Sequence, residues 1–196
     1  MACDEARMTH ALRLPGGERV RVRPIRSQDA GVLQAYVRGL SLESRRNRFL
    51  GAVSELAPAE LEHLTHMDCR SQLALIAEVD VDGAPTMIGE ARLAIALDSL
   101  RCEFAMSVAD AWQSQGLGTL LLANLECRAR SLGVRWLVGD VFRSNEAMKG
   151  LARKAGFEMM RPPGDARLVG IMKDILLAHT GPPCDEVAAS GLPLAA

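Results

Sequence analysis

A glycine-containing turn between a strand pattern and a helix pattern is the most restrictive feature of this sequence. The strand pattern runs to Val108, and an apolar helix pattern begins at Gly116. Gly116 and Gly118 carry no Cβ atom, so the backbone there can approach a ligand closely. The first N–H groups of a helix lack intrahelical partners and lie at the positive end of the helix dipole. Because such groups attract anions, the turn predicts a site for a diphosphate.

The spacing of the glycines excludes two better-known phosphate-binding loops. A dinucleotide loop would need a third glycine where this sequence has Leu121, and a nucleoside-triphosphate loop would need a Gly-Lys-Ser/Thr. What remains is Gln113-x-x-Gly116-x-Gly118, followed after one more strand and helix by Asn145 and Gly156-Phe157. This arrangement resembles the GNAT superfamily of acetyl-CoA-dependent N-acetyltransferases, whose pyrophosphate loop has the form Gln/Arg-x-x-Gly-x-Gly/Ala.

Within that superfamily, the sequence is most similar to the acetyltransferase domain of bacterial protein-lysine acetyltransferases. The segments that carry this likeness are residues 21–26, 39–49, 103–110, 113–119 and 150–157. The resemblance implies acetyl-CoA as co-substrate, no metal, and a primary amine as acceptor, with a protein lysine favoured.

The periodicity of apolar residues predicts an α/β fold with a mixed sheet. Strands are predicted at 19–23, 73–79, 87–96, 101–108, 134–142, 157–161 and 168–175, and helices at 27–40, 42–50, 58–67, 116–133 and 145–154. A helical crossover makes strands 101–108 and 134–142 a parallel pair. The resemblance implies a GNAT-type, mostly antiparallel twisted sheet with helices on both faces, in which that pair splays apart to hold acetyl-CoA.

The chain of 196 residues is long enough for one domain with its own core. Residues 1–17 are predicted to form an N-terminal extension, since the first eleven have no periodicity. Residues 18–177 are predicted to form the GNAT acetyltransferase domain. Residues 178–196, rich in small residues and prolines, are predicted to be a flexible C-terminal tail.

Charge and cysteine content favour a cytoplasmic protein that binds neither nucleic acid nor membrane. The formal net charge is −1, so the whole protein has no field that attracts polyanions. No apolar run approaches the length of a membrane span, and Asp4 and Glu5 lie where a signal peptide would be apolar. The five cysteines are scattered, which fits a reducing compartment. His63 and His66 offer too few ligands for zinc.

Acetylation of a lysine needs a neutral amine, because an ammonium group has no lone pair. Deprotonating a free lysine at pH 7 costs about 4.6 kcal/mol, so a general base is useful. The resemblance implies that Glu103 is this base, and desolvation in an apolar strand would suit it to the task. Glu78 and Glu90 also lie on strand patterns and are rivals. A Glu103 that only faces water from the sheet is the alternative.

Acetyl-CoA contacts follow from the resemblance, residue by residue. The backbone at Met106, Ser107 and Val108 pairs with the pantetheine arm. The other contacts are at Gln113, Ser114, Gln115, Gly116, Leu117, Gly118, Thr119 and Asn145. Asn145 also fits a helix N-cap, and both roles are compatible.

One position departs from the family pattern. Many GNAT enzymes have a tyrosine in the last helix that protonates the departing thiolate, and this sequence has Ala152 there. Water could supply that proton, since a thiol of pKa near 8.5 leaves more easily than an amine. Direct attack of the amine in a ternary complex is the predicted mechanism. A small-amine acceptor and a non-catalytic acyl-CoA sensor remain alternatives, and the oligomeric state is left open.

Overall fold

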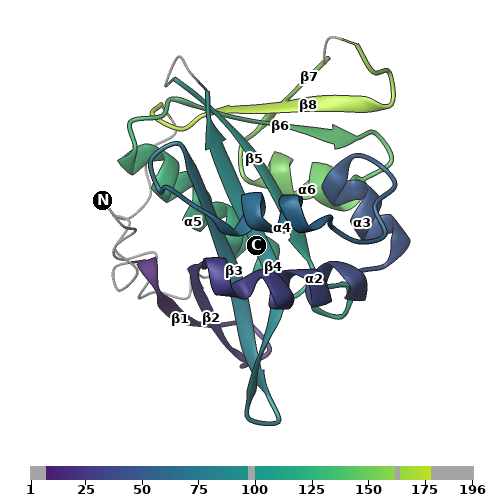
Figure 1. Cartoon of the computed structure of the whole chain (residues 1–196). Coiled ribbons are helices and arrows are strands. Elements are labelled where there is room, and N and C mark those ends of the chain that lie inside the picture. The colour runs from purple at the N-terminus through teal and green to yellow at the C-terminus, as the bar shows by residue number, and fades with distance from the viewer. Residues whose placement is uncertain (1–7, 97–99, 162–163, 178–196) are drawn as a thin grey trace.

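The computed structural model describes residues 8–96, 100–161 and 164–177 (Figure 1). Eight strands form one sheet in the order β1-β2-β3-β4-β5-β6-β8-β7. The strands are β1 His10–Arg13, β2 Arg19–Pro24, β3 Gln72–Val81, β4 Ala84–Ile95, β5 Arg101–Val108, β6 Trp136–Phe142, β7 Glu158–Met160 and β8 Leu168–Asp174. The helices are η1 Ser27–Asp29, α2 Ala30–Gly39, α3 Leu42–Phe49, α4 Pro58–Thr65, η2 Asp110–Trp112, α5 Leu117–Ser131 and α6 Glu146–Lys154.

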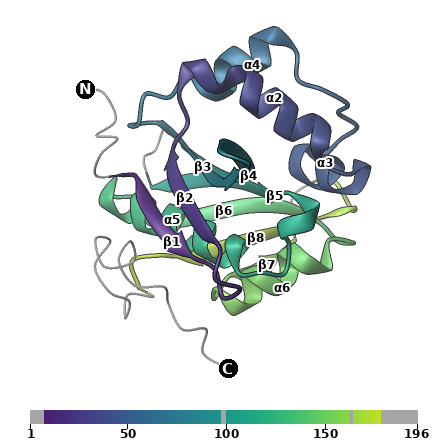
Figure 2. The same cartoon turned by 90° about the horizontal axis from the view of Figure 1, so that it is seen from below.

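Helices cover both faces of the sheet. Figure 2 shows α2, α3 and α4 on one face and α5 and α6 on the other. One apolar cluster, which includes Leu121, Leu125 and Phe157, packs on the α5 and α6 side. A second cluster, which includes Leu33 and Val37, packs on the α2 and α4 side. The predicted three-layer α/β arrangement with a mostly antiparallel sheet is therefore confirmed.

β5 and β6 are parallel, and they separate after a short stretch of pairing. Their register joins Arg101 to Trp136, Cys102 to Leu137 and Glu103 to Val138. A Cβ atom added at Gly139 would lie 3.3 Å from the backbone oxygen of Phe104, so a glycine permits the close approach where pairing ends. Beyond this point β5 continues to Val108 without pairing to β6. The predicted splayed parallel pair is thus present.

The N-terminal edge of the sheet was not predicted. β1 pairs antiparallel with β2, although sequence analysis assigned its residues to an extension. The strand has four residues, and only Leu12 among them is buried, so it is too short to show a period. The predicted tail, residues 178–196, lies outside the described residues.

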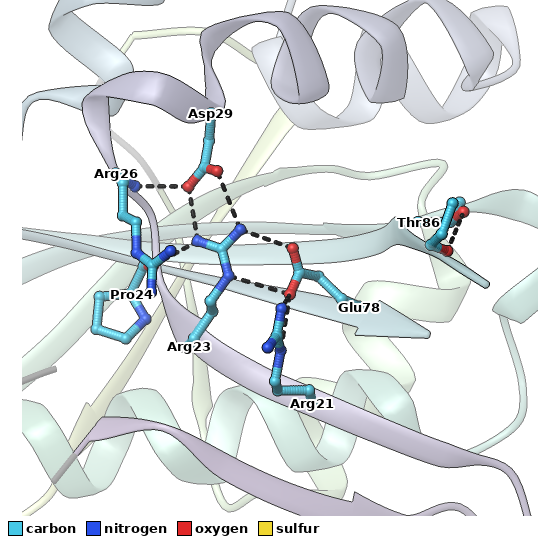
Figure 3. Close-up of polar contacts among 8 residues, drawn as sticks. Arg21, Arg23, Pro24, Arg26, Asp29, Glu78 and Thr86 are labelled. Atoms are coloured by element: carbon cyan, nitrogen blue, oxygen red, sulfur yellow. Dashed lines mark hydrogen bonds and ion pairs between the residues drawn. The ribbon is translucent and has the colours of Figure 1, made fainter. Parts of the chain in front are cut away.

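A buried charge network fastens β2 to β3 and to the start of α2 (Figure 3). Arg23 donates to Asp29 at 2.6 and 3.0 Å and to Glu78 at 3.0 and 2.7 Å. Arg21 donates twice to Oε2 of Glu78, at 2.7 and 3.0 Å. Arg23, Asp29 and Glu78 are each 3–5% exposed. Every charge in this network therefore has an opposite charge within hydrogen-bond distance, which burial requires.

The cysteines differ from one another in state. Cys102 is a buried free thiol, and burial raises its pKa to about 12. Cys69 and Cys127 are disulfide-bonded, which sequence analysis did not predict. Sequence spacing gave no sign of these bonds, since disulfide pairing depends on proximity in the fold rather than along the chain.

Candidate active site

A cavity of about 1000 Å³ lies where β5 and β6 separate. Its walls come from β5, the loop before α5, α3, the end of β6 and α6. Ten of the residues selected from the sequence line it: Glu103, Met106, Ser107, Val108, Gln113, Ser114, Gly116, Gly118, Thr119 and Asn145. Two do not. Leu117 is buried in the core, and the side-chain amide of Gln115 donates to the Ala111 carbonyl. The catalytic role of Glu103 and the ligand-binding roles of the other eleven stay predictions.

The loop from Gln113 to Gly118 contains two residues with positive φ. Gly116 is the N-cap of α5 with φ of 88°, and Ser114 has φ of 60°. A residue with a side chain, such as Ser114, rarely adopts such a φ angle, whereas glycine does so without penalty. At Gly118, an added Cβ would lie 3.3 Å from Leu151, so the first turn of α5 passes close to α6. The first N–H groups of α5 are thereby presented beside the cavity.

Asp110 ties this loop to α3, which forms the opposite wall. Its carboxylate accepts from the Ser41 amide at 2.9 Å and from the hydroxyls of Ser41 and Ser44 at 2.7 Å. Although burial opposes it, these hydrogen bonds hold the pKa of Asp110 below its usual value. The Gln113 amide donates to Ser44 at 3.2 Å and to the Val108 carbonyl at 3.1 Å. Asp110 therefore fixes the turn and links it to α3.

Two exposed carboxylates face the cavity from the separating strands. Glu103 lines the cavity but is exposed, so the expected desolvation of its carboxylate is absent. Asp140 of β6 is also exposed and lines the same cavity. Val138 pairs with Glu103 and lies two residues before Asp140, so both carboxylates project from one face of the sheet. Asp140 was not among the residues predicted from the sequence, although its place near the end of a parallel strand could have indicated a site residue.

The two rival glutamates are held by arginines. Glu90 is 1% exposed and accepts from Arg48 at 2.6 Å and from Arg92 at 2.7 Å. Burial would raise its pKa, but the two guanidinium charges lower it to about 2. Glu78 is committed to the network with Arg21 and Arg23. Neither carboxylate is therefore suited to accept a proton from a substrate near neutral pH.

The similarity of this chain to known proteins agrees with the geometry of the site. Residues 41–157, more than half of the chain, match the acetyltransferase (GNAT) family. The chain belongs to the GNAT acetyltransferase family. Members of this family use acetyl-CoA and an acceptor. The cavity volume of about 1000 Å³ is large enough for a cofactor such as acetyl-CoA.

Similar proteins cover most of the chain. An acetyltransferase of Pseudomonas aeruginosa is 33% identical over 156 residues, which are 80% of this chain and 84% of that protein. The GNAT domain of PAT from S. lividans has a TM-score of 0.77 at 26% identity, over 85% of this chain and 96% of that one. A cAMP-binding acyltransferase from Mycobacterium smegmatis has a TM-score of 0.62 at 20% identity, over 92% of this chain and 52% of that one, and shows likeness of fold alone.

The GNAT residues of α6 divide between a cap and the core. The Asn145 side chain accepts from the Met148 amide at 3.0 Å, which makes it the N-cap of α6. Asn145 also lines the cavity, so the cap leaves it beside the ligand space. Ala152, at the position of the family tyrosine, is fully buried among core residues. The last helix therefore presents no phenol to the cavity.

The three arginines of α3 contact neighbouring elements, although Arg46 is exposed to solvent. Arg48 is buried against Glu90 and also lines the cavity. The Arg46 guanidinium lies 4.4 Å from the ring centre of Phe142, and Arg45 donates to the backbone oxygens of α2. These contacts hold α3 over the cavity by joining it to the neighbouring elements.

The described residues contain no group of three metal-ligating side chains and no membrane-spanning helix. A second cavity, of about 330 Å³, is lined by Glu62, His63, His66, Asp68 and Gln72. Across residues 8–96, 100–161 and 164–177, no three His, Cys, Asp or Glu side chains converge as metal ligands would. In the same residues, every helix is too short or too polar to cross a bilayer.

Proposed function

We propose that this GNAT chain is an N-acetyltransferase that transfers the acetyl group of acetyl-CoA to a protein lysine. The observation that carries the proposal is the cavity between β5 and β6. Glu103, near the start of β5, lines this cavity, and so do residues of the loop at 113–119, which follows the end of β5. This arrangement supports acyl transfer because an anion-binding loop and a carboxylate share one ligand space.

The proposed reaction is direct attack of the amine on the thioester. The amide groups of residues 115–119 and the hydroxyl of Thr119 hold the pyrophosphate, and the backbone of 106–108 pairs with the pantetheine arm. The amine nitrogen forms a bond to the acetyl carbon while the carbon–sulfur bond breaks, and its electron pair stays on sulfur. The Glu103 carboxylate accepts the proton that the amine loses, and the thiolate gains a proton from water.

Charge in the cavity supports a cationic acceptor such as a lysine side chain. The exposed carboxylates of Glu43, Glu103, Asp140 and Glu146 line it, and Lys154 is the exposed cation among its lining residues. A negative lining attracts an ammonium group, which then needs a base before it can react. The sequence resemblance to protein-lysine acetyltransferases supports a lysine over a small amine.

Thiol-release kinetics with acetyl-CoA, measured against a panel of proteins and small amines, test this proposal. We expect release of coenzyme A thiol with lysine-rich proteins, and acetyl-lysine in the product by mass spectrometry. The small amines in the panel are a polyamine, a free amino acid and an aminoglycoside. Turnover with one of these amines and none with proteins would show that the acceptor is a small amine and not a protein lysine. Tight acetyl-CoA binding without thiol release from any acceptor would indicate a sensor.

Alanine at Gly116 is expected to weaken acetyl-CoA binding about 5- to 30-fold. The native φ of 88° is unfavourable for an L-residue, so the loop relaxes and binding has to restore the strained form. Isothermal titration calorimetry measures the affinity. Gly31→Ala is the matched control, because an added Cβ meets nothing within 4 Å and its φ is not positive. Equal affinities in the two variants would contradict a role for this loop.

A further inference from the structure

Tyr36 and Ser107 form a hydroxyl pair beside the cavity. The phenolic oxygen of Tyr36 lies 2.9 Å from Ser107 Oγ, and the two residues are 71 positions apart. Tyr36 is the single tyrosine of the sequence and is 6% exposed, so its ring is buried under α2. Ser107 is half-buried and lines the cavity. A buried phenol thus supports a hydroxyl that a ligand can reach.

The pair leaves one hydrogen free for a ligand. Either hydroxyl can donate, and in the arrangement proposed below Tyr36 donates and Ser107 accepts. Burial, and then the negative charge of Glu90, raise the pKa of Tyr36 above its ordinary value. Tyr36 therefore keeps its proton throughout the physiological range. A serine hydroxyl that accepts from Tyr36 has its own hydrogen free to donate into the cavity.

The position of Ser107 suits a role at the reacting group. Side chains four residues apart on a strand lie on the same face, so Ser107 projects from the face of β5 that carries Glu103. Ser107 also lies within the backbone segment that, under the proposed function, pairs with the pantetheine arm. The α6 helix provides no phenol at this site, since Ala152 is buried in the core.

We propose that the Ser107 hydroxyl donates a hydrogen bond to the sulfur of the departing coenzyme A, with Tyr36 as the positioning residue. The inference rests on the proposed function. As the nitrogen–carbon bond forms, the carbon–sulfur bond breaks and its electron pair moves to sulfur. The Ser107 O–H stabilises that charge and keeps its proton, because an alkoxide is far more basic than a thiolate. Water protonates the thiolate after it leaves, and Glu103 carries the proton of the amine.

The charged groups around the pair stay constant over the pH range of the test. Glu90 is ion-paired to Arg48 and Arg92, and Asp110 accepts hydrogen bonds from α3. The pKa values of Glu90 and Asp110 lie below their usual range, so both stay ionised above pH 6. A pH dependence that coenzyme A shows and desulfo-coenzyme A lacks therefore reports the thiol, since both ligands carry the same phosphates.

The decisive experiment compares the affinities of coenzyme A and desulfo-coenzyme A from pH 6.5 to 9. If bound thiolate is stabilised, its pKa falls below the free value of about 8.5, and affinity for coenzyme A rises with pH. Desulfo-coenzyme A has no thiol, so it should lack the rise centred between the bound and free thiol pKa values. We expect wild type to show a rise of about tenfold, Ser107→Ala to show none, and Tyr36→Phe to show less than wild type.

Steady-state kinetics give a second, independent readout. Ser107→Ala should lower kcat about tenfold with an unchanged KM for acetyl-CoA, and Ser107→Thr, which keeps a hydroxyl, should retain most of the rate. Thr86→Ala is the control, because it removes an exposed strand hydroxyl from β4. A Ser107→Ala protein with the wild-type pH dependence of binding and wild-type kcat overturns the inference. If wild type turns over no acceptor, the proposed function fails, while the binding comparison still decides the role of Ser107.

Discussion

Glutamine in place of Glu103 is expected to slow acetyl transfer about 10²- to 10⁴-fold. The amide has nearly the shape of the carboxylate but cannot accept the proton that the amine loses. Since Glu103 is exposed and lines the cavity, the change should leave folding and acetyl-CoA affinity as they are. The measurement is thiol release at saturating acetyl-CoA, together with calorimetric affinity for the donor.

The pH dependence separates a base from a binding group. Below the pKa of the acceptor, near 10.4 for a lysine, most of the amine is protonated and the base is needed. The loss in Glu103→Gln should therefore be greatest near pH 7 and shrink as the pH approaches 10. Asp140→Asn is the matched control, because Asp140 is an exposed carboxylate in the same cavity. Equal rates for wild type and Glu103→Gln at every pH would show that Glu103 is not the base. A loss of rate in Asp140→Asn alone would assign the role of base to Asp140.

Local pattern was sufficient for the part of the site that lies along one stretch of chain. The apolar residues before Val108, the turn at Gly116 and the helix that follows are neighbours in sequence, so their periods and glycines predict a strand, a loop and a helix. The crossover from β5 to β6 follows from the right-handed rule for parallel strands. These features predicted the α/β fold and the loop, whereas the splayed pair that opens the cavity was implied by the family resemblance.

Contacts between distant residues could not be predicted in this way. Tyr36 meets Ser107 across 71 positions, and Asp110 meets Ser41 across 69. Which polar side chains meet depends on how α2 and α3 pack on the sheet, and a single sequence carries no periodic signal for that. The exposure of Glu103 was left as an open alternative for a related reason: a strand pattern predicts which residues share a face, but not whether a cavity opens above it.

Methionine in place of Arg23 is expected to destabilise the protein by about 3–5 kcal/mol. The change leaves Asp29 buried with the Arg26 amide as its hydrogen-bond donor and the Arg26 charge nearby, and it leaves Glu78 paired with Arg21 alone. An uncompensated buried carboxylate costs more than the pair contributes to stability, because its lost hydration is no longer offset. Urea unfolding at pH 7, followed by circular dichroism, measures the loss of free energy of unfolding.

Arg21→Met is the control for this substitution, since Arg21 donates to the same carboxylate but its side chain is 52% exposed against 6% for Arg23. Its effect should stay below about 1 kcal/mol. Burial would raise the pKa values of Asp29 and Glu78, but Arg23 holds both below their ordinary values. In wild type, this stability is therefore present above about pH 4.5 and lost as the pH falls further. Without Arg23, protonation relieves the buried carboxylates, so the gap between variant and wild type should narrow in acid. Equal losses in the two arginine variants would mean that burial does not set the strength of this network.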